Sequence, residues 1–253
     1  DMFGEGRKNS HGWNLADPLE LTALQKDRDT FKQQTWSAEP LIGGVAHSGD
    51  AQPVLNPANP DDVVGQVTQA SPAHIEDALA KATIGIELWR SSKVEDRAAC
   101  LLRIADLYED NSVELMALAA REAGKTLNDC VGELREAVDF CRYYAAETKM
   151  ADQQRQGRGV FLCISPWNFP LAIFTGQIVA ALVSGNAVIA KPAEQTPLIA
   201  TRAIQLMHQA GIPGDVLHLL PGDGPSVGGV LAADPRISGV CFTGSTDTAR
   251  IIN

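Results

Sequence analysis

The residues that can do chemistry gather in four short polar loops, each of which follows an apolar run of the sequence. In chain order the loops are Ser165-Pro166-Trp167-Asn168-Phe169-Pro170, Lys191-Pro192-Ala193-Glu194, Gly222-Asp223-Gly224-Pro225-Ser226-Val227-Gly228 and Thr243-Gly244-Ser245-Thr246. They offer a cation, a carboxylate, small hydroxyls and backbone amides that glycines leave accessible. Ribose hydroxyls and a pyrophosphate bind to groups of these kinds. The set therefore predicts a dinucleotide site.

The second loop favours one dinucleotide over the other. Lys191 places a cation and Glu194 an acceptor at one strand end, as ribose hydroxyls require. A carboxylate at that place disfavours a 2′-phosphate, so we expect NAD to be preferred over NADP. The glycines of the third loop allow close backbone approach, but their GxGxxxG spacing is weak evidence alone. Glycine-rich turns often serve only as tight turns.

Asn168 has two interpretations. Its side-chain amide follows a buried strand and can donate a hydrogen bond to a developing oxyanion. The alternative is an asparagine that caps the following helix, which for an isolated motif is the more common role.

Residues 160–253 alternate between apolar runs and helical stretches. The runs are Val160–Ile164, Ala187–Ala190, Val216–Leu220 and Gly239–Phe242, and the helices after them are expected to reach Val183, to span Pro197–Gln209 and Pro225–Ala232, and to begin near Ser245. The runs are apolar throughout, which is typical of strands buried on both faces of a parallel sheet. We therefore predict an α/β fold with a Rossmann-type parallel sheet, right-handed crossovers and a ligand at the carboxyl ends of the strands.

Changes of pattern divide the chain into three regions. Residues 1–39 are polar and irregular, and we expect a linker or arm. Residues 40–150 are expected to form the strand and helical part of the cofactor-binding domain, with a turn at residues 59–62 and a helix that Gly124 ends. Residues 151–253 carry the Rossmann-type NAD-binding βα units.

Composition excludes several classes of partner. The 253 residues carry a formal charge of -10, which argues against nucleic acid as a partner of this segment. The longest apolar stretch is too short to span a bilayer, and residues 1–9 do not resemble a secretory signal. The five cysteines are scattered and never stand at metal-ligand spacing. We expect reduced thiols in a cytoplasmic protein and no metal site.

The loops together resemble the aldehyde dehydrogenase superfamily. The motifs that carry this resemblance are Pro166-Trp167-Asn168-Phe169-Pro170, Lys191-Pro192-Ala193-Glu194 and Phe242-Thr243-Gly244-Ser245-Thr246, in the family's order, with Asn56-Pro57-Ala58 and Val63-Val64-Gly65 as its N-terminal strand signature. The resemblance extends from about Leu41 to the end of the chain. It implies an aldehyde dehydrogenase-like fold, in which an N-terminal helical and strand region accompanies the Rossmann-type sheet.

A narrower resemblance points to the bifunctional proline utilization A enzymes, in their L-glutamate γ-semialdehyde (pyrroline-5-carboxylate) dehydrogenase part. The stretches that carry it are Asn9-Ser10-His11-Gly12, Leu15-Ala16-Asp17-Pro18, Arg121-Glu122-Ala123-Gly124-Lys125-Thr126, Glu133-Leu134-Arg135-Glu136-Ala137-Val138-Asp139-Phe140, Cys163-Ile164-Ser165 and Gln195-Thr196-Pro197. This resemblance implies NAD-dependent oxidation of L-glutamate γ-semialdehyde to L-glutamate in proline catabolism.

The resemblance also implies a role for each matching residue. Asn168 would be the catalytic oxyanion donor, and Phe169 either one wall of the aldehyde pocket or a packing residue. Lys191 and Glu194 would hold the adenosine ribose, and Ser245 a pyrophosphate oxygen. The other expected cofactor-binding residues are Ile164, Ser165, Pro166, Trp167, Gly224, Gly228, Phe242, Thr243 and Gly244.

The chain departs from the family's pattern in one respect. The mechanism that the resemblance implies needs a cysteine nucleophile and a glutamate that activates water, and both lie beyond the Thr-Gly-Ser motif in this family. None of the five cysteines is expected to replace that nucleophile. We therefore expect an inactive piece without its catalytic domain, and an isolated sheet edge that promotes association.

The implied parent protein would be a homo-oligomer with further partners. These are a small-molecule aldehyde, the missing catalytic domain and a proline dehydrogenase half that would carry FAD. The resemblance leaves open a peripheral visit of the parent to the membrane. Two alternatives remain: an aldehyde dehydrogenase with another substrate, against which the segment before Leu41 argues, and a non-catalytic nucleotide-binding module.

Overall fold

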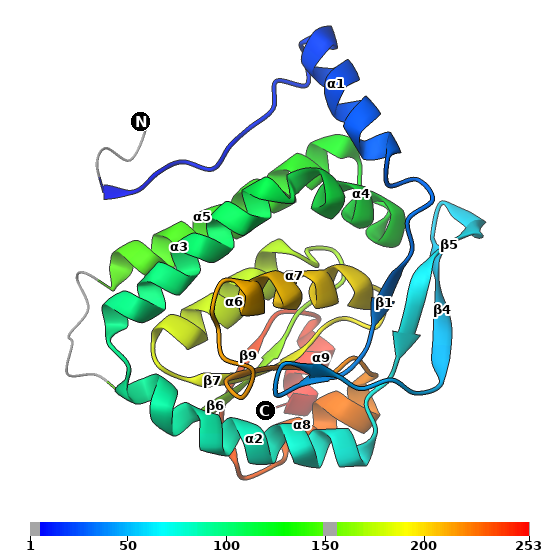
Figure 1. Ribbon diagram of the computed structural model, residues 1–253. Helices are drawn as coiled ribbons and strands as arrows, with labels where there is room; N and C mark the ends of the chain where they lie inside the picture. The colour runs from blue at the N-terminus through cyan, green and yellow to red at the C-terminus, as the bar shows by residue number, and fades with distance from the viewer. Residues whose placement is uncertain (1–5, 149–155, 253) are drawn as a thin grey trace.

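The strands that precede the polar loops lie side by side in one sheet (Figure 1). The computed structural model describes residues 6–148 and 156–252. The spatial order of the sheet is β3 (Val45–Ala46), β2 (Leu41–Ile42), β8 (Leu217–Leu219), β7 (Ala187–Lys191), β6 (Val160–Ile164) and β9 (Ile237–Phe242). The pairs β8–β7, β7–β6 and β6–β9 are parallel, which confirms the predicted α/β class.

One edge of this sheet is antiparallel, which the sequence analysis did not foresee. β2 pairs with β8 through Leu41 and Leu219, and β3 folds back on β2. Each of the two added strands has only two residues, too few for a periodic pattern to be visible. The prediction of a Rossmann-type parallel sheet therefore holds for its centre and did not include this antiparallel edge.

Burial differs between the centre and the other edge of the sheet. Every residue of β7 and β8 is buried, whereas no residue of β9 is fully buried. β9 lies at the edge of the sheet among the described residues. Its apolar sequence therefore does not have both faces covered here, contrary to what continuous apolarity suggested.

Helices cover both faces of the sheet (Figure 1). α6 (Ala172–Val183) and α7 (Pro197–Gln209) follow β6 and β7 and lie together on one face, as right-handed crossovers require. After β8 the chain returns across the sheet through the π-helix η2 (Gly224–Gly228) and α8 (Gly229–Ala232). The expected single helix over 225–232 is thus divided in two. α9 (Thr246–Ile252) follows β9.

A further layer of helices packs outside α6 and α7. Its members are α3 (Val94–Asp110), α4 (Ser112–Ala123) and α5 (Leu127–Glu147), while α2 (Pro72–Ser91) lies on the opposite side of the sheet. Ser71 and His74 form a reciprocal capping box at the start of α2. Gly124 adopts φ 66° after α4, which confirms the predicted helix end.

Buried Glu122 joins this layer to α7. Its carboxylate accepts hydrogen bonds from the amides of Leu198 at 2.6 Å and Ile199 at 2.9 Å. α7 has no cap from its own N-cap residue, Thr196, so a side chain from α4 supplies the missing acceptor. Burial raises the pKa of Glu122, and the two amide hydrogen bonds oppose that rise.

The remaining elements form a small sheet and an arm. β1 (Trp36–Ala38), β5 (Asn59–Thr68) and β4 (Ala51–Asn56) pair in the order β1-β5-β4, and α1 (Pro18–Asp29) packs on α4. The β4–β5 turn lies at residues 57–58, where Asn56 pairs with Asn59, so the turn predicted at 59–62 was misplaced. The predicted boundary between residues 150 and 151 lies outside the described residues.

No helix within the described ranges has the length and apolarity needed to cross a membrane.

Histidine 218 should make folding sensitive to acid. His218 is buried in β8, where the Gly43 amide donates to Nδ1 at 3.2 Å and Nε2 lies 3.1 Å from the Asp215 carbonyl. Burial lowers its pKa from 6.5 to about 4. Above pH 6.5 both folded and unfolded states hold it neutral. As the pH falls towards 4 only the unfolded state gains the proton, so the free energy of unfolding falls by about 3 kcal/mol.

Urea unfolding between pH 7 and pH 4 tests this expectation. The His218→Gln variant retains a donor and an acceptor but does not titrate, so its unfolding free energy should fall less over the same range. Equal falls in both proteins would show that His218 does not carry the effect.

Candidate functional site

The carboxyl ends of β6, β7 and β9 surround a cavity of about 990 Å³ together with η2. Every residue to which the family resemblance assigned a catalytic, substrate-binding or cofactor-binding role lines this cavity. These residues are Ile164, Ser165, Pro166, Trp167, Asn168, Phe169, Lys191, Glu194, Gly224, Gly228, Phe242, Thr243, Gly244 and Ser245. Parallel strands bring loops that are far apart in sequence to one edge of the sheet, which explains the convergence.

Lys191 and Glu194 form the charged part of the cavity wall. Lys191 is only 5% exposed, and its ammonium donates to the Pro192 carbonyl at 3.0 Å. Burial lowers the pKa of Lys191, while the carboxylates of Glu194 and Asp223 act in the opposite direction. Glu194 accepts a hydrogen bond from the Gly224 amide at 3.0 Å, which holds the carboxylate at the start of η2.

The glycines of the third loop have different tasks. A Cβ on Gly224 would meet no atom within 4 Å, so this backbone is open to the cavity. A Cβ on Gly222 would lie 2.3 Å from the Val227 side chain, so Gly222 serves packing and does not line the cavity. The close approach expected at all three glycines was therefore wrong at Gly222. Asp223 accepts from the Ser226 amide at 2.6 Å and caps η2.

Asn168 is exposed to the cavity and does not cap α6. The N-cap residue of α6 is Leu171, which makes no side-chain cap hydrogen bond. Instead Glu133 of α5 accepts from the amides of Leu171 at 3.1 Å and Ala172 at 3.0 Å. The capping alternative for Asn168 was therefore wrong, and its amide is left to face the cavity.

Glu133 also contacts Lys125, which lies against Phe169 of the first loop. Its second carboxylate oxygen lies 3.2 Å from Lys125 Nζ, and both side chains are nearly inaccessible to solvent. Lys125 Nζ in turn lies 4.6 Å from the centre of the Phe169 ring, a cation–π contact. Burial raises the pKa of Glu133, against the opposing effects of Lys125 and the two amides. One ion pair thus contacts both the Phe169 ring and the start of α6, which follow Asn168 in the chain.

Gln177 of α6 joins the ends of two strands under the cavity. With its amide oriented to satisfy both of its polar atoms, the nitrogen donates to the Ile164 carbonyl at 3.2 Å and the oxygen accepts from the Thr243 hydroxyl at 3.0 Å. The Thr243 amide also donates to the Ile164 carbonyl at 3.1 Å. Gln177 therefore fixes the separation of the first and fourth loops.

Sequence reasoning missed Lys125, Glu133 and Gln177. A charged residue next to the apolar stripe of a helix, as Glu133 is, signals a buried partner, but it does not identify that partner. Further apolar lining comes from Ile173, Ala232, Ala233, Ile251 and Ile252.

None of the five cysteines, which all lie within the described ranges, lines this cavity. Cys163 and Cys241 are register partners in β6 and β9, and Cys241 lines a separate cavity. A hydrogen bond from Cys163 lowers the pKa of Cys241 to about 7, whereas burial raises the pKa of Cys130 to about 11. Among the residues that the structure describes, no group of three or more His, Cys, Asp or Glu side chains can hold a metal ion.

Fold and site together define an α/β protein whose cavity opens at the carboxyl ends of parallel strands. The chain belongs to the aldehyde dehydrogenase family, which matches residues 45–253. The predicted superfamily resemblance is thereby confirmed.

Individual relatives agree with this family. The bifunctional protein PutA of Escherichia coli (strain K12) is 46% identical over 254 residues, which cover 100% of this chain and 19% of that protein. Proline utilization A from Bdellovibrio bacteriovorus, inactivated by N-propargylglycine, has a TM-score of 0.93 at 30% identity over 98% of this chain and 28% of that chain. A 1-pyrroline-5-carboxylate dehydrogenase from Thermus with bound NAD has a TM-score of 0.91 at 31% identity, covering 97% and 51%.

The chain is thus similar to the enzymes that its narrower sequence resemblance indicated. It spans about a fifth of the length of the curated PutA relatives that it matches.

Removal of the Glu133 side chain should destabilise the fold. Glu133→Ala leaves Lys125 without its partner and the first amides of α6 without an acceptor, so we expect a loss of about 3 to 5 kcal/mol in the free energy of unfolding. Glu133→Gln retains one acceptor and should cost less. Urea denaturation followed by circular dichroism measures both changes.

The control is Glu136→Ala, which removes an exposed carboxylate from the same helix and should change stability by less than about 0.5 kcal/mol. Equal losses for Glu133→Ala and Glu136→Ala would contradict the role assigned to Glu133.

Proposed function

We propose that the chain forms the NAD-binding part of an L-glutamate γ-semialdehyde dehydrogenase and supplies the oxyanion donor of that enzyme. The observation that carries this proposal is the convergence of Lys191, Glu194, Ser245 and Asn168 on one cavity. The net reaction of the parent enzyme would convert the semialdehyde, NAD⁺ and water into glutamate, NADH and two protons.

The residues of the cavity fit NAD. Lys191 is a buried ammonium, and a single carbonyl contact leaves it further donor capacity for ribose hydroxyls. Glu194 provides the acceptor beside it, and the open backbone at Gly224 leaves room for a flat base. When bound, NAD would supply the hydride acceptor of the reaction.

Ser245 would contribute to the binding of the pyrophosphate. Its hydroxyl oxygen accepts from the Thr248 amide at 3.1 Å at the start of α9, and the site lies beside Gly244. Phosphate oxygens bind favourably to hydroxyls and free amides of this kind. Ile164, Pro166, Trp167, Phe242 and Thr243 would form the walls of the same cleft.

Asn168 would act on the aldehyde oxygen. Negative charge develops on that oxygen when a nucleophile attacks the carbonyl carbon, and a fixed amide donor stabilises it. Phe169, 38% exposed over Lys125, would form a wall of the aldehyde pocket. No cysteine of this chain lines the cavity, so the nucleophile and the base for hydrolysis would come from another part of the parent protein.

The names of the relatives support the substrate and the cofactor. Two of them are PutA proteins, and a third is a 1-pyrroline-5-carboxylate dehydrogenase with bound NAD. The same proposal includes three further properties of the parent protein. It would carry a flavin in a proline dehydrogenase half, form a homo-oligomer and be located in the cytoplasm.

Lys191→Ala should weaken NAD binding. Loss of a hydrogen bond from a buried charged group costs about 1.5 to 3 kcal/mol, which corresponds to a dissociation constant roughly 10 to 100 times larger. Calorimetric titration of the 253-residue chain measures the change. The matched control is Lys32→Ala, which alters an exposed lysine far from the cavity and should leave the affinity unchanged.

A semialdehyde turnover assay on the same samples separates the alternatives. We expect NAD binding without turnover. Turnover by these 253 residues would overturn the assignment of the nucleophile to another part of the protein. A folded chain that binds no NAD would favour a non-catalytic module, and a parent enzyme that prefers another aldehyde would favour a different substrate.

Glu194→Gln should reduce the preference for NAD over NADP. A neutral amide still contacts ribose hydroxyls but no longer repels a 2′-phosphate. We expect the ratio of the NADP and NAD dissociation constants to fall by about tenfold. An unchanged ratio would mean that Glu194 does not face the ribose.

A further inference from the structure

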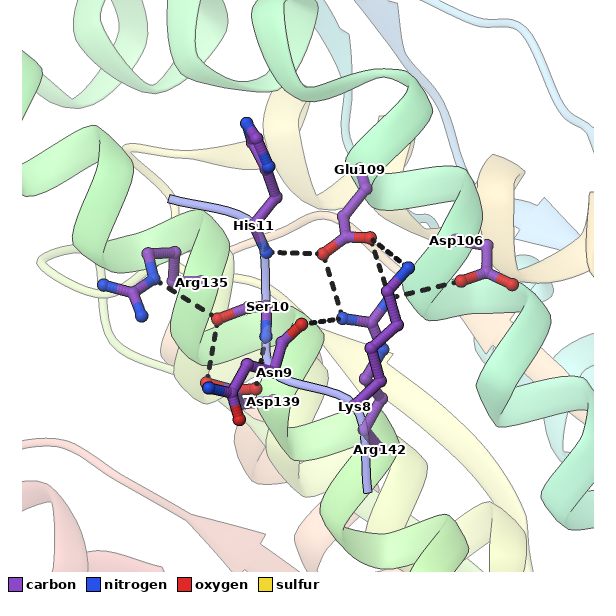
Figure 2. A network of polar contacts seen from close by, with 9 residues as sticks. All are labelled: Lys8, Asn9, Ser10, His11, Asp106, Glu109, Arg135, Asp139 and Arg142. Carbon is purple, nitrogen blue, oxygen red and sulfur yellow. Dashed lines mark hydrogen bonds and ion pairs between the residues drawn. The ribbon is translucent and has the colours of Figure 1, made fainter. Parts of the chain in front are cut away.

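An extended segment near the N-terminus lies along α3 and α5 (Figure 2). Residues 8–11 belong to no helix or strand. Backbone groups of such a segment are ordinarily left to water. Here consecutive residues are hydrogen-bonded to side chains that lie about one hundred positions or more later in the sequence.

Three backbone contacts hold this segment. The Asn9 carbonyl accepts from Arg142 Nη1 at 2.9 Å. The Ser10 amide donates to Asp139 Oδ1 at 3.2 Å, and the His11 amide donates to Glu109 Oε1 at 2.7 Å. Each residue from 9 to 11 thus forms a backbone hydrogen bond with a side chain of α3 or α5.

One side chain of the segment is recognised as well. The Ser10 hydroxyl donates a hydrogen bond to Asp139 Oδ2 at 2.9 Å and accepts one from Arg135 Nε at 3.3 Å. Ser10 is only 7% exposed, so a larger or anionic side chain at this position would meet Asp139 directly. The contacts therefore favour a small hydroxyl-bearing side chain at position 10. The neighbours Asn9 and His11 are bound through their backbone groups.

The helices hold the receiving groups in place. Arg142 is 3% exposed and pairs with Glu109 at 2.7 Å and Asp106 at 3.2 Å. Burial alone would raise the pKa of Glu109, but hydrogen bonds from Arg142 and the His11 amide outweigh burial and lower it. Lys8 adds a longer contact with Glu109 at 3.8 Å. Figure 2 shows that these groups converge on the segment from both helices.

We propose that the α3–α5 face is a peptide-docking site whose occupant is the chain's own Asn9–His11 segment, and that this site anchors the polypeptide preceding Lys8 to the helical layer. The proposal does not depend on NAD binding, since none of its residues lines the cavity.

The docking site includes α5, the same helix that supports the start of α6. α5 carries the docking residues Arg135, Asp139 and Arg142, and it also carries Glu133, which holds the start of α6. α5 packs closely on α6, where the Phe140 ring lies over Gly176. The anchored polypeptide is therefore connected to the Asn168 loop through one helix.

Amide hydrogen exchange of the whole 253-residue chain tests the docking. The Ser10 and His11 amides should exchange about 100 times more slowly than in a free peptide of residues 6–16. Trypsin cleavage after Lys8 should be slowed in the same way, because a protease needs an undocked segment. Exchange at the free-peptide rate would overturn the proposal.

Variants identify the groups responsible. Asp139→Asn and Glu109→Gln should each reduce the protection by about tenfold, and Ser10→Asp should abolish it because it adds a carboxylate beside Asp139. The matched control is Asp110→Asn, an exposed neighbour on α3 that should change nothing. Circular dichroism and NAD titration establish that each variant is folded. Protection that persists in a folded Ser10→Asp protein would contradict the proposal.

Discussion

Two buried carboxylates connect the helical layer to the α/β layer, and the form of the cavity depends on them. Glu122 binds the first amides of α7, and Glu133 binds those of α6. Neither helix has a cap from its own N-cap residue, so each depends on a side chain from another helix. A helix N-terminus favours negative charge, and burial makes the contact directional. Because α6 and α7 begin directly after the loops of β6 and β7, the contacts that hold the helices also hold the loops.

Features with a local cause could be predicted from the sequence. Apolar runs marked β6, β7, β8 and β9, and the helix predicted over Pro197–Gln209 has the same bounds in the structure. The positive φ of Gly124 follows from the absence of a Cβ. Once the strands were known to be parallel, the meeting of their loops in one cavity followed from topology alone. This is why every residue to which the resemblance assigned a role lines that cavity.

Features that depend on distant partners could not be predicted. Leu41 and Ile42 are too short a run to indicate pairing with β8, and the turn at residues 57–58 competed with a stronger turn signal just after it. Asn168 was weighed as a cap because the true acceptor, Glu133, lies 38 positions before Leu171, whose amide it binds. Gln177 carried no signal, since its role arises only when Ile164 and Thr243 come together.

The short antiparallel strands β2 and β3 close one edge of the sheet and leave the β9 edge for any further strand. β2 and β3 occupy the outer side of β8, and a two-residue strand offers few free peptide groups for another strand. β9 instead presents a half-exposed six-residue strand at the opposite side. A further parallel strand of this sheet would therefore pair with β9, whose carboxyl end leads into Thr243–Ser245. Any such strand would end at the floor of the cavity and bring its own loop to the site.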